Sequence, residues 1–190
     1  MAVKKLWNDN WEFCECPLED QYYEIPKDAN WESVDIPHDW MIYDTRNLYR
    51  DSIGWYRKKF YINHEQLQHR TSLRFDGVYM DSTVFINGKQ AYEWKYGYST
   101  FEFDITEFLH EGLNEVLVRV VYQHSNSRWY SGAGIYRNVW IKTYQDEHLL
   151  ADGVYITTVP LENGVFRVEI ETEIHIAPEE KGERILRQTI

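Results

Sequence analysis

The sequence predicts an all-β protein built as a β-sandwich, with helical turns only at its edges. Apolar and polar residues alternate with period two through most of the chain, which is typical of half-buried strands. Asn-Gly pairs lie between such segments and favour tight hairpin turns. Aromatic residues make up 16% of the 190 residues, with 15 Tyr and 8 Trp, and these side chains favour strands. A hydrophobic content of 43% is sufficient for a packed core.

The first part of the chain contains six segments with strand patterning. In the fifth, Val116, Val118, Val120 and Tyr122 share one face. The pair Asn87-Gly88 predicts a two-residue hairpin turn, because both residues tolerate positive φ. The predicted strands are 54–62, 71–78, 82–87, 99–103, 116–122 and 137–144.

Helical signals are few and short. Asp104 precedes Glu107 with capping-box spacing, which predicts one turn that ends near Gly112. Asn63 is expected to cap another turn before Leu67. Both turns are interpreted as connections between strands.

A second unit is predicted to begin near Asp146. Segments 154–159 and 165–176 flank the hairpin signal Asn163-Gly164, and the later segment alternates apolar with charged residues. Pro178 and a charged run then interrupt the pattern. Because about 45 residues with two or three strands do not close a sandwich core, we expect a domain cut partway through, within a longer protein.

Charge and composition exclude several classes of partner. The formal net charge of −11 disfavours nucleic acid and anionic membranes. No apolar run is long enough to span a bilayer, and the N-terminal residues lack the apolar core of a secretory signal, so a cytoplasmic location is expected. Cys14 and Cys16 are expected to face the same side of a strand as two free thiols.

The common catalytic and metal-binding patterns are not found. There is no nucleophile elbow and no His-x-x-x-His spacing, so the sequence predicts no catalytic residue, no metal site and no cofactor. His38 and Asp39 are candidates for an acid/base pair, but the side chains of neighbours on an extended chain point apart. A structural corner with Pro37 and Trp40 is the preferred interpretation.

Segment 127–141 combines arginines and large aromatic residues around a Gly-x-Gly turn and then reads as a strand. It is written SRWYSGAGIYRNVWI. Sugar rings offer an apolar face to aromatic side chains and hydroxyls to arginine, which makes a carbohydrate site one interpretation. A packed corner, with its arginines paired to the acidic surface, is the other. The residues alone leave both open.

Several motifs together resemble the N-terminal sugar-binding domain of glycoside hydrolase family 2, the family of β-galactosidases, β-glucuronidases and β-mannosidases. They occur in the family's order and cover about residues 5–145. Within the family, SRWY followed by GAGIYR at 127–137 is most similar to the β-galactosidase branch. The motifs are WESVDIPHDW at 31–40, GWYRKKF at 54–60, LRFDGVYMDSTVFINGK at 73–89, GYSTFEFDIT at 97–106, LNEVLVRV at 113–120 and SRWYSGAGIYRNVWI at 127–141.

The resemblance implies a jelly-roll, galactose-binding-domain-like β-sandwich over residues 1–145. Residues 146–190 would be the first strands of an immunoglobulin-like sandwich. A catalytic (β/α)₈ barrel would follow, so this chain is expected to have no hydrolase activity alone. The expected partners are a β-galactoside-type sugar and that barrel, with homo-oligomer formation possible.

The resemblance also implies which residues contact sugar. One family loop matches Asp51 and Ser52 here, just before the segment at 54–56. The other matches residues 125–130, where many members supply an aspartate that this chain lacks. Arg137 is expected to anchor the turn. In that second loop the candidates are Asn126, Arg128, Trp129 and Tyr130.

Three functions remain as predictions from the sequence. The leading one is a non-catalytic module that shapes one wall of a hydrolase's active site. An autonomous carbohydrate-binding module or lectin is the second, and a structural domain for oligomer assembly is the third.

Overall fold

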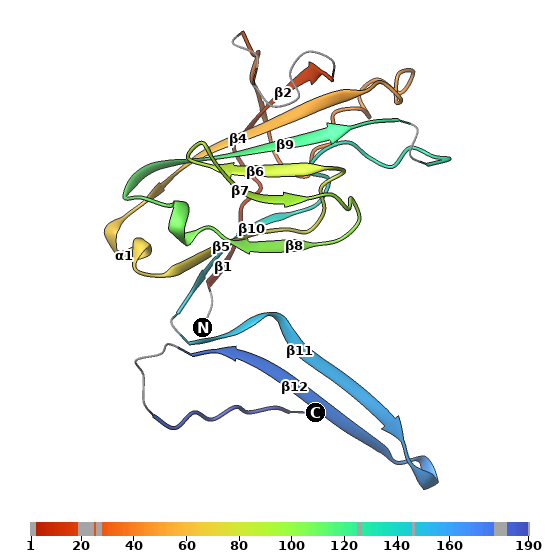
Figure 1. Ribbon diagram of the computed structural model, residues 1–190. Helices are drawn as coiled ribbons and strands as arrows, with labels where there is room; N and C mark the ends of the chain where they lie inside the picture. Colours follow the sequence, from red (N-terminus) through yellow and green to blue (C-terminus); the bar gives the residue numbers. More distant parts are fainter. Residues whose placement is uncertain are drawn as a thin grey trace. The chain divides into compact units, whose positions relative to one another are not determined.

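The all-β prediction is confirmed in the computed structural model, which describes residues 3–18, 25, 28–124, 127–145, 147–176 and 182–189. The chain divides into two compact units, one of residues Val3–Thr143 and one that contains the residues from Tyr144 onward. The strands of the larger unit form two antiparallel sheets of a β-sandwich (Figure 1). Both helices of this unit are single turns, as predicted.

A six-stranded sheet and a four-stranded sheet make up the larger unit. Their orders are β3-β2-β4-β9-β6-β7 and β1-β10-β5-β8. The sequence did not predict β1 and β3, because four and three residues are too few to show a periodic pattern. The strands are β1 Val3–Leu6, β2 Trp11–Pro17, β3 Glu32–Val34, β4 Ser52–Ile62, β5 Arg70–Phe75, β6 Ser82–Ile86, β7 Lys89–Trp94, β8 Phe101–Asp104, β9 Gly112–Tyr122 and β10 Val139–Tyr144.

The main core fills the space between the two sheets. The inward face of β9 is buried as its alternation predicted. From the other sheet, the rings of Phe75 and Phe101 stack at 5.1 Å and those of Phe101 and Phe103 at 6.3 Å. Tyr92, on β7 of the six-stranded sheet, stacks on Phe103 at 4.5 Å. Burial of these large side chains supplies the main stabilising force of the sandwich.

A second, smaller cluster lies on the outer face of the six-stranded sheet. Cys14 and Cys16 lie there with Trp55, and the partly buried Trp31 packs over them. Both thiols are free, and their side chains share this cluster, as expected for residues two apart on a strand. Burial raises the pKa of Cys14 to about 11 and also raises that of Cys16.

The backbone of segment 133–135 holds two other segments together inside the sandwich. His38 N–H donates to Ile135 O at 2.9 Å and Trp40 N–H to Ala133 O at 3.2 Å. On the other side, Tyr79 and Gly134 exchange N–H···O bonds of 2.8 and 2.9 Å. Gly134 has φ of 127°, and a Cβ there would lie 2.3 Å from the Tyr56 hydroxyl. Glycine is therefore required at this position.

The turns at Asn63 and Asn87-Gly88 form with the expected chemistry, whereas the capping box predicted at Asp104 does not form. Helix α1, His64–Leu67, begins with a capping box in which the Asn63 side chain accepts from Gln66 N–H at 2.8 Å. The 3₁₀ turn η1, Thr106–Phe108, ends before the predicted Gly112, and no side chain caps it. The Asp104 carboxylate accepts from Thr106 N–H at 2.8 Å and from Arg70 Nε at 2.7 Å, and not from Glu107 as predicted. Asn87 and Gly88 both have positive φ and connect β6 to β7.

The second unit contains one long hairpin, β11 His148–Pro160 paired with β12 Phe166–His175. The turn at Asn163-Gly164 was predicted, but η2, Glu162–Gly164, makes it longer than a two-residue turn. Strand β11 also begins six residues before the predicted 154, because an irregularity between Leu149 and Val154 breaks the alternation.

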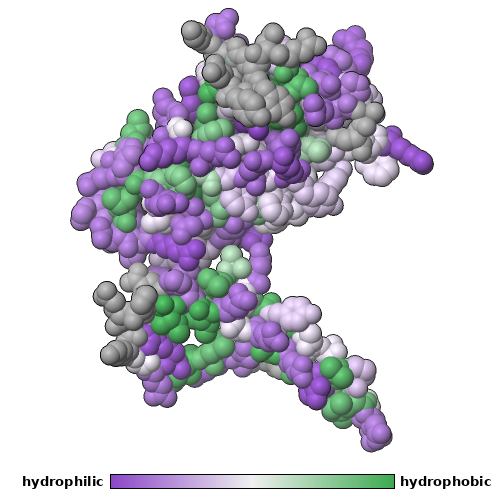
Figure 2. Space-filling model, viewed as in Figure 1, coloured by the Kyte–Doolittle hydropathy of each residue, from purple (hydrophilic) through white to green (hydrophobic). Residues whose placement is uncertain are grey.

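The hairpin has one apolar face. Ile156 pairs with Ile170, Thr158 with Val168 and Pro160 with Phe166, so these side chains share a face, while the glutamates of β12 occupy the other. Many of the apolar side chains are exposed, as the hydrophobic surface along the hairpin in Figure 2 shows. Two strands do not form the closed core of an immunoglobulin-like domain. The assignment of residues 146–190 to such a domain therefore stays a prediction.

Lys58 is a buried charge in the larger unit. Its Nζ donates to the carbonyls of Trp7 and Asp9 and lies 4.8 Å from the centre of the Trp7 ring. Burial lowers the pKa of Lys58 to about 8. The carbonyls and the ring compensate part of the lost hydration.

We expect Gly134→Ala to lower the free energy of unfolding by about 3 kcal/mol or more, because the new Cβ meets backbone and a buried hydroxyl. Urea denaturation measures this loss. Gly88→Ala is the matched control: φ there is also positive, at 78°, but no atom lies within 4 Å of the added Cβ. It should cost only about 1–2 kcal/mol. Equal losses would show that the close approach at Gly134 is not the constraint.

We also expect the free energy of unfolding to rise with pH between about 8 and 10.5, the folded and ordinary pKa values of Lys58. In this range the unfolded chain binds a proton at Lys58 that the folded chain has released, so raising the pH favours folding. Denaturation at several pH values should show this slope in the native protein and a smaller slope in Lys58→Met. Lys59→Met, at the exposed neighbouring position, should leave the slope unchanged.

Candidate functional site

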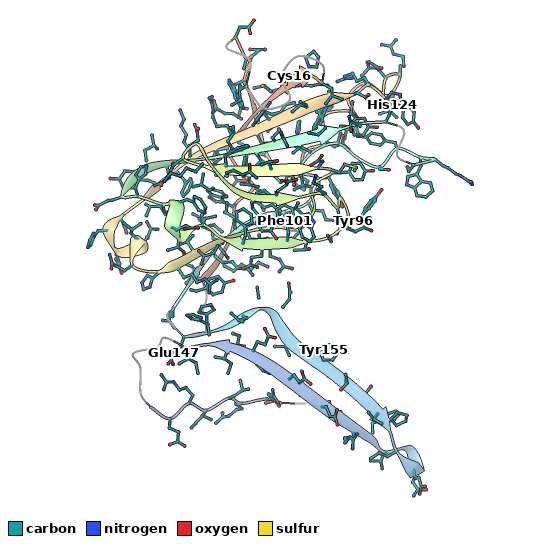
Figure 3. The ribbon with its side chains drawn as sticks, viewed as in Figure 1. Cys16, Tyr96, Phe101, His124, Glu147 and Tyr155 are labelled. Atoms are coloured by element: carbon teal, nitrogen blue, oxygen red, sulfur yellow. The ribbon has the colours of Figure 1, made fainter. Side chains whose placement is uncertain are left out.

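The predicted sugar-contact residues that the structure describes lie at one end of the six-stranded sheet. The register aligns Ser52 with Tyr122 and Ser82 with both Val120 and Trp94, so the loops that precede β4 and follow β9 and β7 leave the same end. Figure 3 shows His124, just after β9, and Tyr96, just after β7, at this end of the sandwich. We call the loop of residues 127–131 the sugar loop.

Asp51 is fixed beside the end of β9. Its Oδ1 accepts from His124 N–H at 2.8 Å and lies 2.7 Å from the His124 Nδ1. Burial favours a higher pKa for Asp51, but the hydrogen bonds from the His124 backbone and side chain outweigh it and lower the pKa. Asp51 is therefore a carboxylate at neutral pH. Arg50 fixes the same loop through a bidentate pair with Glu15, with distances of 2.9 and 2.7 Å.

Ser52 does not present its side chain at this end. The residue is only 2% exposed, and its Oγ accepts a hydrogen bond of 3.1 Å from Trp40 Nε1. This burial argues against the predicted direct contact between Ser52 and a sugar. The sequence match could not reveal it, because the residue directly follows the exposed Asp51 on the chain.

The sugar loop presents Trp129 to solvent. This side chain is 65% exposed, and Arg128 beside it is exposed as well. Ser127 shapes the loop: its Oγ lies 2.5 Å from Trp129 O, 3.2 Å from Trp129 N and 2.9 Å from Ser131 Oγ. These local bonds define the backbone on which the indole is presented. The candidate Asn126 lies outside the described residues.

Tyr130 connects the sugar loop to the core and does not extend into solvent. Its hydroxyl donates to Asp39 Oδ1, which also accepts from Met41 N–H at 3.1 Å. Burial raises the pKa of Tyr130 well above its ordinary value, and the Asp39 carboxylate adds to this effect. The sequence did not single out Asp39 for this role, because its partner lies 91 residues away.

His38 and Asp39 have different partners. The Nδ1 of His38 lies 2.9 Å from the Tyr56 hydroxyl in the core, while Asp39 binds Tyr130. Burial lowers the pKa of His38. The two side chains thus build a corner, which agrees with the preferred interpretation of the sequence.

A separate hollow of about 780 Å³ lies beside β2 and β3. Its lining includes Phe13, Glu32, Trp40 and Tyr43, and none of the predicted sugar-contact residues. Within the described residues, no group of three His, Cys, Asp or Glu side chains is placed to hold a metal ion. No helix among these residues is long and apolar enough to cross a membrane.

We expect Tyr130→Phe to lower the free energy of unfolding by about 1–2 kcal/mol, because it removes a hydrogen bond to a carboxylate. Asp39→Asn should have a similar effect. In a double-mutant cycle measured by denaturation, the pair should show a coupling of at least about 1 kcal/mol. Purely additive losses would contradict the anchoring role of this bond.

The chain resembles known proteins in sequence and in structure. Residues 15–145 match the family described as "Glycosyl hydrolases family 2, sugar binding domain". The chain is 40% identical to the beta-galactosidase BoGH2A of Bacteroides ovatus over 143 residues, which cover 69% of this chain and 17% of that protein. It is 37% identical to a beta-glucuronidase of Bacteroides fragilis over 118 residues, or 60% of this chain and 16% of that protein.

Among solved structures, a beta-glycosidase from Bacteroides vulgatus aligns with a TM-score of 0.78 and 26% identity, over 94% of this chain and 25% of that one. The chain spans less than a fifth of the length of the two relatives named above. The matched residues include β4 to β10, the sugar loop and Asp51. The chain therefore belongs to the glycosyl hydrolase family 2 proteins, in which it corresponds to the sugar-binding domain.

Proposed function

We propose that this chain forms one wall of the active site of a β-galactosidase-type glycoside hydrolase. The sugar loop and Asp51 would border the terminal sugar, and another part of the polypeptide would supply the catalytic groups. The observation that carries the proposal is the exposed Trp129 on a loop braced by Ser127 and Tyr130, at the same end of the sheet as Asp51.

The chemistry of these side chains suits a carbohydrate. The Trp129 indole offers an apolar face to the C–H side of a pyranose ring, and Arg128 offers donors to hydroxyl groups. Asp51 is an acceptor whose charge is retained at neutral pH, because the bonds from His124 favour its ionised form. A site that combines an aromatic face with a fixed acceptor and donors orients a neutral sugar.

The two relatives named above are a β-galactosidase and a β-glucuronidase, so the sugar itself needs a direct test. A glucuronide carries a carboxylate that would pair with an exposed arginine such as Arg128. A galactoside would need only the aromatic and hydrogen-bonding groups. We propose the galactoside, and a comparison of galactoside and glucuronide substrates distinguishes the two.

In the complete hydrolase, we expect Trp129→Ala to lower kcat/KM about tenfold without a change in melting temperature, because an exposed side chain that borders the sugar contributes to binding but not to the core. The control is Tyr61→Ala. Tyr61 is 68% exposed and lies near the C-terminal end of β4, whereas Ser52 begins that strand. Unchanged kcat/KM in Trp129→Ala would refute the proposal. Measurable galactose binding by the isolated chain, in calorimetry, would favour an autonomous carbohydrate-binding module.

A further inference from the structure

A pair of exposed tyrosines lies beside the sugar loop, on a connection that the proposed function does not use. Residues 95–100 join β7 to β8 and read KYGYST. Tyr96 is 62% exposed and Tyr98 45% exposed. Figure 3 shows Tyr96 at the same end of the sandwich as His124. We call residues 96–98 the tyrosine loop.

The tyrosine loop is held firmly by its backbone. Gly97 is buried, and its carbonyl accepts a hydrogen bond of 2.8 Å from the Tyr136 hydroxyl. A Cβ on Gly97 would lie 2.3 Å from the Tyr79 ring, so the loop backbone packs directly on that side chain. Trp94 Nε1 donates to Ser99 Oγ at 3.1 Å just after the loop. The two exposed rings are thus presented on a fixed backbone, which reduces the entropy that a ligand would have to remove.

The tyrosine loop is linked to the sugar loop through the side chain of Tyr79. The ring of Tyr79 contacts that of Tyr98 at 5.3 Å, and Tyr98 contacts Tyr96 at 5.9 Å, in edge-to-face geometry. The Tyr79 side chain also interacts with that of Ser131, and its Cβ lies 3.7 Å from the position of a Cβ on Gly132. The buried Tyr79 therefore connects the tyrosine loop to the end of the sugar loop.

The chemistry of this surface fits a neutral, hydroxyl-rich ligand. Residues 96–100 carry no charged side chain, but they do carry two exposed rings that each bear a hydroxyl group. The hydroxyls of Ser99 and Thr100 bond within the protein, to Trp94 Nε1 and Asp76 O. Lys95, at the start of the connection, pairs with Glu93 at 3.1 Å. An anionic or cationic ligand would find no opposite charge on these residues, whereas a sugar uses both ring faces and hydroxyls.

We propose that Tyr96 and Tyr98 form a second sugar subsite, which binds the next residue of an oligosaccharide whose terminal sugar lies at the sugar loop. This inference rests on the proposed function. It implies that the proposed active site acts on oligosaccharides, and not only on a single sugar that carries a small leaving group. The ring faces supply binding, and the fixed backbone supplies orientation.

The test compares two substrates in the complete hydrolase. A glycosyl fluoride of the accepted sugar has no second sugar, whereas a β-linked trisaccharide with the same terminal sugar does. We expect Tyr96→Ala and Tyr98→Ala each to lower kcat/KM for the trisaccharide about three- to tenfold, the size of one aromatic contact. For the fluoride, kcat/KM should stay within about twofold. Tyr96→Phe, which keeps the ring, should retain most of the trisaccharide activity.

Each outcome has one meaning. An equal loss on both substrates, or no loss on the trisaccharide, overturns the second subsite. Both variants could instead lower the melting temperature of the complete hydrolase without a selective loss of kcat/KM for the trisaccharide. That result also overturns the second subsite and indicates that the two rings contact another part of the protein. Tyr61→Ala should leave kcat/KM unchanged for both substrates. The proposed function is tested separately by Trp129→Ala, which should reduce kcat/KM for the fluoride and the trisaccharide alike.

Discussion

The close approach of backbone at Gly134 is the constraint on which the candidate site depends. Segment 133–135 is hydrogen-bonded on one side to the corner at 38–40 and on the other to Tyr79. Gly134 sits where a side chain would strike the Tyr56 hydroxyl. The corner supplies Asp39 to the sugar loop, and Tyr79 supports the tyrosine loop. Three loops from distant parts of the sequence are therefore placed relative to one another by one short run of backbone.

The fold was largely predictable because its strongest signals are local. Alternation in β9 and β12, the positive-φ pair Asn87-Gly88 and the cap at Asn63 all depend on neighbouring residues, and each appears as predicted. The capping box predicted at Asp104 is absent. Strands β1 and β3 were missed because short strands are stabilised by pairing with distant segments and not by their own pattern. The length of β11 was missed because an irregularity interrupts its alternation.

The candidate site was less predictable, because its contacts join residues that are far apart in sequence. The family motifs placed Asp51 and the sugar loop near a ligand, but they carried no information on which side chains face inward. Ser52 is buried and hydrogen-bonded to Trp40, and Tyr130 is hydrogen-bonded to Asp39. Only the three-dimensional arrangement shows that Trp129 and Arg128 are exposed, while their neighbours hold the loop in place. The family motif at 97–106 includes part of the tyrosine loop, but it did not indicate a binding role, since the proposed role depends on the contact with Tyr79.

The two thiols on the outer face of the six-stranded sheet have a consequence for studying this molecule in solution. Thiolates, not thiols, react with alkylating reagents, and a pKa of about 11 at Cys14 leaves very little thiolate at neutral pH. Burial beneath Trp31 further restricts reagent access. We therefore expect a low background of cysteine labelling in the native protein. A spectroscopic probe on a new surface cysteine would then report on its own loop, while slow alkylation of Cys14 and Cys16 would time the opening of the layer that covers them.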